Sequence, residues 1–224
     1  MTLPLEPSYI LALETAITGG SISLLRDSVV IDSMAGNDSL SRAEELLPNI
    51  TSILDKNGIS LDQIERIAVS VGPGSYTGIR IGMASAMGLS TAIDSKCVGV
   101  PILYAMTLLA DKGSKRCLTA VPVGRGDTAY QLFMLDDDRG LRPLDAPGIA
   151  ANADFDNIVA CLEPDCVIVH GQIHGLLGDL SGMKLILTGN DLASLIGRAS
   201  GDDWIPHDLV PIYLLNKNRN NGLF

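Results

Sequence analysis

The sequence predicts an α/β protein, and three observations lead to this prediction. Short runs rich in apolar and β-branched residues, such as residues 67–71, have the length and composition of buried strands. Apolar residues at helical spacing follow several of these runs. Glycine and proline separate the two kinds of segment, as at residues 72–74, and both residue types end regular structure.

The first half of the chain is expected to contain five strands. They are short apolar runs bounded by turn residues, at 9–13, 21–25, 28–34, 67–71 and 96–100. A capping box at 41–44 predicts a helix over 41–56, bent at Pro48. Ser75 is a natural N-cap for a second helix over 76–93, and Pro101 starts a third that runs to about residue 111.

The second half of the chain begins after a link at residues 112–115. We expect an antiparallel pair of strands at 116–123 and 128–135, and the remaining elements are strands at 166–169 and 185–187 and helices at 154–162 and 191–200. The acidic turn at 136–140 lacks the ligand spacing of a calcium loop, so we interpret it as a solvated turn.

The composition limits the classes of function. The 224 residues are 46% hydrophobic and 19% charged, which is typical of a globular chain with a sizeable core. The formal net charge of −10 disfavours a main role in gripping RNA, because phosphates repel an acidic surface. Four cysteines without a Cys-x-x-Cys pair, no signal peptide and no bilayer-spanning run predict a cytoplasmic protein with reduced thiols.

The helix over 76–93 carries a stripe of small residues. Four of them lie four positions apart and share one face: Gly78, Gly82, Ala86 and Ser90. Because a glycine costs a helix about 1 kcal/mol relative to alanine, the stripe implies the close approach of another backbone. Met83 and Met87 add adaptable apolar surface beside it. We expect that neighbour to belong to a partner, and packing inside the chain is the alternative.

The run Gly-Pro-Gly-Ser-Tyr-Thr-Gly-Ile-Arg-Ile-Gly at residues 72–82 resembles the signature Gly-Pro-Gly-Ser-Phe-Thr-Gly-Leu-Arg-Ile-Gly of the TsaB (YeaZ) family. Only Tyr76 and Ile79 differ. Residues 211–214 are similar to the family's closing Pro-x-Tyr-Leu-Arg, although Leu215 replaces the arginine. The resemblance implies the actin-like ATPase (ASKHA) architecture, with two lobes that each hold a mixed sheet flanked by helices. The expected lobes are residues 1–111 and 112–224, with the last residues either returning to the first lobe or disordered.

The resemblance also implies a function by association. Members of this family are non-catalytic subunits of the bacterial machinery that makes threonylcarbamoyladenosine in tRNA. We therefore expect a scaffold that binds and activates a catalytic TsaD-type homologue, has no catalytic residue, and binds no cofactor or metal alone. ATP or ADP and metal would belong to the partner subunits. A TsaE-type ATPase is a further expected partner, tRNA contact is expected to be indirect, no membrane contact is expected, and the same helices are candidates for a homodimer.

The helices over 41–56 and 76–93 are the expected contact surface. Its expected residues are Leu46, Leu47, Ile50, Gly78, Gly82, Met83, Ala86 and Met87. Two interpretations of Arg80 remain open: it pairs with a carboxylate or covers apolar surface within the chain, or it contacts the partner.

A glycine turn before a helix N-terminus directs N–H groups at an anion, so this loop is a candidate phosphate site. Its expected residues are Gly72, Gly74, Ser75 and Thr77. The loop lacks the lysine of a P-loop, and a tight structural turn is the alternative. Glu14 stands where family members commonly have aspartate, and we interpret it as a solvated carboxylate at a strand end.

The alternative function is a stand-alone enzyme that uses an inter-lobe cleft, either ATP-dependent on a small molecule or a glycoprotease-like peptidase. The sequence has no Gly-x-Ser-x-Gly elbow and only three histidines. His170 and His174 have the spacing of helical metal ligands, but Gly171 and Gly175 disfavour a helix there, so we expect no metal site.

Overall fold

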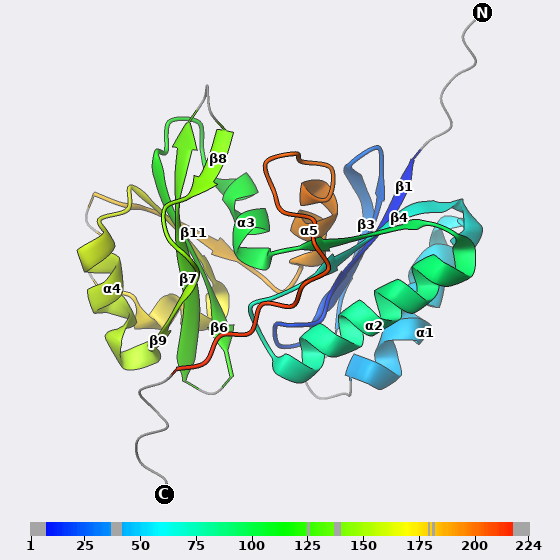
Figure 1. Ribbon diagram of the computed structural model, residues 1–224, viewed down its shortest axis with the longest axis horizontal. Coiled ribbons are helices and arrows are strands. Elements are labelled where there is room, and N and C mark those ends of the chain that lie inside the picture. The colour runs from blue at the N-terminus through cyan, green and yellow to red at the C-terminus, as the bar shows by residue number, and fades with distance from the viewer. Residues whose placement is uncertain are drawn as a thin grey trace, which may run out of the picture.

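The computed structural model describes residues 8–36, 42–124, 126–136, 140–178, 180 and 182–216, without the side chains of residues 42 and 43. Two mixed β-sheets with helices against them form two lobes (Figure 1). The predicted α/β class, with one mixed sheet in each lobe, is confirmed. The middle of the acidic turn at 137–139 and the chain end at 217–224 lie outside the described residues.

The first sheet has the strand order β3-β2-β1-β4-β5. Its strands are β1 (Tyr9–Glu14), β2 (Ser21–Arg26), β3 (Val29–Ala35), β4 (Ile64–Ser70) and β5 (Lys96–Val100). The first three strands form an antiparallel meander, and β4 and β5 are parallel to β1. All five predicted strands are present. The apolar runs of β1, β2, β4 and β5 are largely buried because helices cover both faces of the sheet, whereas the edge strand β3 is mostly exposed.

Two helices cover the outer face of the first sheet, α1 (Arg42–Asn57) and α2 (Tyr76–Ile93), and they lie side by side in Figure 1. The apolar stripe of α1 packs into a core of its own with the outer face of the sheet, where Ile50 and Ile53 are buried. The helix α2 has the predicted bounds, with Ser75 Oγ accepting the N–H of Gly78 at its start.

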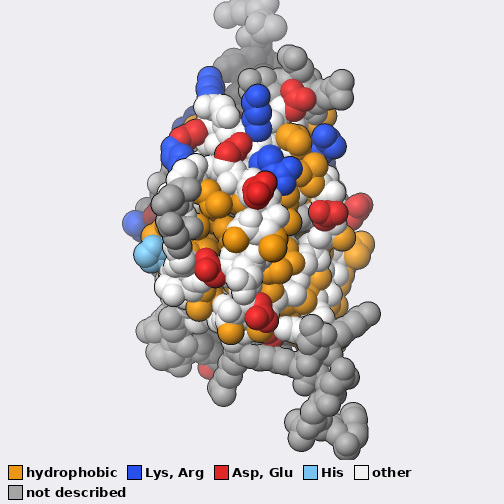
Figure 2. Space-filling model, turned by 90° about the vertical axis from the view of Figure 1, so that its left-hand side faces the viewer, with side chains coloured by type: hydrophobic (Ala, Val, Ile, Leu, Met, Phe, Trp, Pro, Cys, Tyr) orange, Lys and Arg blue, Asp and Glu red, His pale blue; other side chains and the backbone are white. Residues whose placement is uncertain are grey.

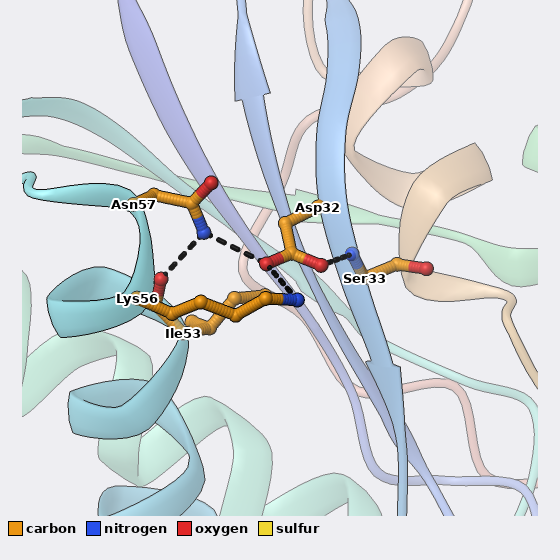
Figure 3. A network of polar contacts seen from close by, with 5 residues as sticks. All are labelled: Asp32, Ser33, Ile53, Lys56 and Asn57. Atoms are coloured by element: carbon orange, nitrogen blue, oxygen red, sulfur yellow. Dashed lines mark hydrogen bonds and ion pairs between the residues drawn. The ribbon is translucent and has the colours of Figure 1, made fainter.

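A cluster of polar contacts fixes the C-terminal end of α1 to the edge strand β3 (Figure 3). The Asp32 carboxylate lies 2.8 Å from Lys56 Nζ and accepts a hydrogen bond of 2.8 Å from Asn57 Nδ2. The same Asn57 amide also donates to the Ile53 carbonyl. One carboxylate on β3 therefore contacts two side chains at the end of α1 and holds this helix against the sheet.

The second sheet has the strand order β11-β10-β6-β7-β8, with β9 also paired to β7. Its strands are β6 (Arg116–Val123), β7 (Asp127–Asp136), β8 (Gly140–Pro143), β9 (Gly148–Ala151), β10 (Cys166–His170) and β11 (Lys184–Thr188). The sequence analysis missed β8 and β9. Each has four residues and few β-branched side chains, so neither carries a strand signal of its own.

One helix of eight residues, α4 (Phe155–Leu162), lies on the outer face of the second sheet with the 3-10 segment η4 (Gly171–Leu176). Figure 2 views the molecule from this end, and hydrophobic side chains reach the surface through the middle of the view, with most basic ones toward its upper part and acidic ones scattered over it. The outer layer of this lobe is therefore thinner than that of the first lobe.

Two short helices lie between the sheets, α3 (Ile102–Met106) and α5 (Ala193–Ala199) (Figure 1). They join both inner sheet faces into one hydrophobic core, which includes Ile10 from the first sheet and Phe133 from the second. The helix expected over 101–111 is shorter than predicted and continues as the 3-10 segment η2 (Thr107–Leu109). The helix α5 packs on β1 and β2 of the first lobe, so the chain returns to its first sheet late in the sequence.

The segment after α5 crosses from one lobe to the other. The Gly99 N–H of β5 donates to the His207 carbonyl at 3.1 Å, and the Ile212 N–H donates to the Val71 carbonyl at 2.8 Å. At its far end, Asn216 Nδ2 donates to Asp127 of β7 at 3.0 Å. A side chain at position 99 would collide with the carbonyl of Asp208, so glycine there permits this close approach.

Candidate functional site

The loop at residues 72–75 is packed tightly against the hairpin between β1 and β2. A Cβ at Gly74 would lie 2.6 Å from the carbonyl oxygen of Ala16, and the Ser75 N–H donates to that oxygen at 2.7 Å. Gly72 has a φ of +95°, and a Cβ there would lie 2.7 Å from Ile79. Both glycines are therefore explained by contacts inside the chain.

Several N–H groups of this loop already have acceptors. The Gly72 N–H donates to Ser70 Oγ, the Gly78 N–H to Ser75 Oγ, and the Ile79 N–H to the Ser75 carbonyl. This arrangement fits the alternative of a tight structural turn that starts α2. The structure brings Gly72, Gly74 and Ser75 together, while Thr77 is exposed on the first turn of α2. A phosphate role for these residues stays a prediction.

Glu14 is fully buried at the end of β1, so its interpretation as a solvated carboxylate was wrong. Its Oε1 atom accepts the N–H groups of Ala16 at 2.6 Å and Ile17 at 3.0 Å. A carboxylate in this position satisfies backbone donors of the tight hairpin that follows the strand. The local sequence gave no sign of this, because the acceptor role depends on how the hairpin folds back over the strand.

The glycine stripe of α2 faces the interior of the same chain. A Cβ at Gly82 would collide with Thr15 Oγ1 in the β1–β2 hairpin and would lie 3.4 Å from Val69 of β4. The Thr15 hydroxyl donates to the Gly78 carbonyl at 2.7 Å. A close neighbour is present, but it consists of the Thr15 and Val69 side chains of this chain and not of a partner's backbone.

Burial corrects the expected contact surface. Of the eight residues expected to contact a partner, five are buried in the core of the first lobe, so their side chains are not available to a partner: Leu46, Ile50, Gly78, Gly82 and Ala86. The other three lie toward solvent. Leu47 on α1 is 51% exposed, Met87 on α2 is 48% exposed, and Met83 is half-buried against the core of the first lobe.

The outward surface of α1 and α2 is therefore the candidate docking face, defined by Leu47, Met83 and Met87. A groove of about 500 Å³ lies at the Leu47 side of this face, lined by Leu47, Ile50 and Leu54 of α1, by Leu89 of α2, and by the turn at residues 59–61, while Met83 and Met87 are not among its lining residues. Exposed large apolar side chains beside a groove are typical of a protein contact surface, because water solvates them poorly. The lining of the groove also includes polar residues, among them Thr51 and Asp55.

A cluster of two tyrosines and one arginine extends this face at the start of α2. The guanidinium of Arg80 lies 3.9 Å from the ring centroid of Tyr76, and its Nε donates to the Tyr213 hydroxyl at 3.2 Å. The two rings are 4.7 Å apart. The hydrogen bond to Tyr213 raises the pKa of Arg80 further above its ordinary value. The sequence analysis named Arg80 but missed its link to Tyr213, which is 133 residues away.

The histidines at 170 and 174 are not brought together as ligands. His170 is buried at the end of β10 with its Nε2 atom 3.1 Å from Asn190 Oδ1, whereas His174 is exposed in η4. In the part of the chain that the structure describes, no three His, Cys, Asp or Glu side chains are grouped for a metal ion. The four cysteines are free thiols.

A second cavity, of about 320 Å³, lies between the lobes under the segment that follows α5. Its walls are largely apolar, with Val71, Pro101 and Pro147 among them, and the charged residue in its lining is Asp208. A carboxylate repels the phosphates of a nucleotide. No described helix has the length and apolar character needed to cross a membrane.

Comparison with known proteins identifies the class first. Two solved structures from Pseudomonas aeruginosa share the fold. YeaZ matches with a TM-score of 0.64 and 21% identity, and the match covers 92% of this chain and 100% of YeaZ. An uncharacterized protein with similarity to peptidase YeaZ matches with a TM-score of 0.66 and 23% identity, and the match covers 93% of this chain and 100% of that protein. The protein is thus a two-lobed α/β protein of the actin-like ATPase fold, as the sequence predicted.

Sequence relatives identify the family. The chain is 33% identical to an uncharacterized protein of Mycobacterium tuberculosis over 212 residues, which are 92% of each chain. It is 31% identical to the tRNA threonylcarbamoyladenosine biosynthesis protein TsaB of Escherichia coli over 131 residues, which span 58% of this chain and 56% of that protein. The family model described as TsaD, tRNA N6-adenosine threonylcarbamoyltransferase, matches residues 39–126. The chain belongs to the TsaB (YeaZ) family.

Proposed function

We propose that this protein acts in tRNA threonylcarbamoyladenosine biosynthesis as a non-catalytic subunit that binds and activates a TsaD-type homologue. The names of its relatives support the process. The observation that carries the mode of action is the docking face, where Leu47 and Met87 are about half exposed and Leu47 lines a groove of about 500 Å³. A helical partner that packed its own apolar ridge here would remove this surface from water.

The matched segment of the family model supports the same partner. It covers residues 39–126 and so includes all of α1 and α2. Two subunits built on related folds can present equivalent helices to each other across a pseudo-twofold axis. The same face then serves a homodimer when the partner is absent, and a TsaE-type ATPase would join the assembled pair. The net charge of −10 is consistent with indirect contact with tRNA.

The test is a binding titration with the TsaD-type protein of the same organism. Charged residues placed in the face, Leu47→Glu and Met87→Glu, should each weaken the affinity at least about tenfold, because a carboxylate would be buried without a partner. Val29→Glu is the matched control, since Val29 is 67% exposed on the edge strand β3 and is not among the residues that line the groove. Equal affinity for all three variants and the unmodified chain would refute the proposal.

The stand-alone enzyme is the competing function, and the cavity between the lobes is its candidate site. Calorimetric titration of the isolated chain with ATP and magnesium separates the two functions. We expect no saturable binding and no turnover, because the lining offers no lysine or arginine to the phosphates. Tight binding with release of phosphate or of a cleaved peptide would support the enzyme and overturn the scaffold.

A further inference from the structure

Arg80 has the properties of an anion-binding group that the chain itself leaves unused. It is exposed near the start of α2, and among the described residues no Asp or Glu side chain forms an ion pair with it. The chain has 26 acidic residues against 16 basic ones, so an exposed arginine without a carboxylate is unexpected by charge alone. Its contacts are with the rings of Tyr76 and Tyr213 and with the Tyr213 hydroxyl.

These contacts hold the guanidinium in one orientation. Its Cζ atom is 3.9 Å from the Tyr76 centroid and 5.9 Å from the Tyr213 centroid, and its Nε–H is bonded at 3.2 Å. An arginine has five N–H donors in a planar fork. With Nε fixed, N–H groups of the two terminal nitrogens remain for an acceptor outside the chain. The side-chain entropy that binding would otherwise cost is already lost in the free protein.

The cluster is continuous with the docking face. Tyr76, Arg80, Met83 and Met87 follow each other at spacings of four, three and four residues, so they lie along one stripe of α2. Seven residues of helix separate Arg80 from Met87, which is a rise of about 10 Å. A partner helix lying along α2 and covering Met87 would therefore also cover Arg80.

We propose that Arg80, held by Tyr76 and Tyr213, is a binding subsite for a carboxylate of the docked protein partner. This inference rests on the proposed function, because it assumes that a partner covers the same stripe of α2. A planar guanidinium binds a carboxylate through two parallel hydrogen bonds, which fixes direction and register as well as adding affinity. Arginine and tyrosine are also the side chains most often found at the energetic centre of protein interfaces. An RNA phosphate is the other chemistry that fits the fork, and the net charge of −10 disfavours it.

The experiment measures the affinity of the TsaD-type partner for the full chain with Arg80→Lys. Lysine keeps the charge but loses the fork and the stacking, so the dissociation constant should rise about tenfold. Arg142→Lys is the matched control, because Arg142 is exposed on β8 in the other lobe. The charge is tested with a neutral variant, Arg80→Gln: the dissociation constant of the unmodified chain should rise more steeply between 50 and 500 mM salt than that of Arg80→Gln, by a factor of about three or more.

A separate readout distinguishes the subsite from a merely structural anchor. Hydrogen exchange at the Ile212 amide, which donates to Val71, reports whether the segment after α5 has come loose. We expect this exchange to be unchanged in Arg80→Lys while the affinity falls. A loss of affinity in Arg80→Lys that is matched by faster exchange at Ile212, together with an unaltered salt dependence in Arg80→Gln, would overturn the subsite.

The other outcomes also decide the question. If Arg80→Lys binds the partner as tightly as the unmodified chain while Leu47→Glu binds weakly, the subsite is wrong and the proposed function stands. If Leu47→Glu and Met87→Glu also bind normally, the proposed function itself fails. If Arg80→Lys weakens only the binding of tRNA to the assembled complex, the ligand is a phosphate and the carboxylate proposal is overturned.

Discussion

Position 82 is occupied by glycine because the packing of the chain itself leaves no room for a side chain there. Thr15 Oγ1 occupies the space that a Cβ would need, and it also donates to the Gly78 carbonyl. We predict that Gly82→Ala lowers the free energy of unfolding by about 1–3 kcal/mol, because Thr15 must move and lose this hydrogen bond. Urea unfolding followed by circular dichroism measures the change.

A second glycine of the same helix provides the matched control for this prediction. Gly88 is exposed, and a Cβ there would meet no atom within 4 Å. Gly88→Ala should therefore raise the free energy of unfolding by about 0.5–1 kcal/mol through helix propensity alone. Equal effects of the two substitutions would contradict internal packing as the reason for glycine at position 82.

The four thiols differ in access, and this predicts their order of alkylation. Cys161 is exposed on α4, Cys97 is half-buried, and Cys117 and Cys166 are fully buried on paired strands. Burial raises the pKa of the Cys97 thiol, which lowers its thiolate fraction at neutral pH. Mass spectrometry after iodoacetamide treatment should show label first at Cys161, then at Cys97. Label at Cys117 or Cys166 before unfolding would contradict the structure.

At the level of elements, the ion pair between β3 and α1 predicts a pH dependence of stability. Hydrogen bonds from Lys56 and Asn57 lower the pKa of Asp32 below its ordinary value of 3.8. A carboxyl with a lowered folded pKa stabilises the fold above its unfolded pKa, and this stabilisation is lost as pH falls through the folded value. Asp32→Asn should therefore be less stable than the unmodified chain at pH 7, and the difference should shrink in acid.

The measurement for Asp32 is a series of urea unfolding curves between pH 7 and pH 3. Asp203→Asn serves as the control, because Asp203 is an exposed acid outside this cluster. Its difference from the unmodified chain should stay constant across the series. A difference for Asp32→Asn that grows toward pH 3 would have the wrong sign and would reject the role assigned to this carboxylate.

Elements with strong local signals were predicted well from sequence. The helix α2 and the strand β5 have the predicted bounds, because a cap, a turn and a run of β-branched residues define them locally. The strands β8 and β9 were missed, since they exist through pairing with β7 and not through their own composition. The two helices α1 and α2 were predicted correctly. Five of the eight residues that were expected on their outward surface are buried instead.

That error has a clear physical source. A stripe of small residues predicts a close neighbour, but a sequence pattern does not say whether the neighbour belongs to the same chain. The answer depended on Thr15, which lies 63 residues before its hydrogen-bond acceptor Gly78. The link between Arg80 and Tyr213 was missed for the same reason. Contacts between distant segments are a property of the fold, and local spacing carries little information about them.

At the scale of the whole molecule, the lobes share one hydrophobic core, and this predicts that the first lobe does not fold alone. The helix α5 packs against β1 and β2, and its Gly197 lies so close to the sheet that a Cβ would meet Leu25 and Ala12. A fragment of residues 1–111 lacks α5 and leaves this sheet face exposed to water. We expect the fragment to bind a hydrophobic dye and to lack dispersed amide resonances in NMR spectra, whereas the full chain unfolds in one transition. A well-dispersed spectrum from the fragment would contradict a shared core.

The late return of the chain to its first sheet has a consequence for biosynthesis. Strand β5 obtains the acceptor for its Gly99 N–H from His207, and the face of β1 and β2 is covered by residues 193–199. A nascent chain on the ribosome therefore cannot complete its first lobe until the residues around His207, more than a hundred positions after β5, have been translated. During that interval the half-made sheet presents bare apolar surface, which makes the growing polypeptide a substrate for chaperones that bind emerging chains.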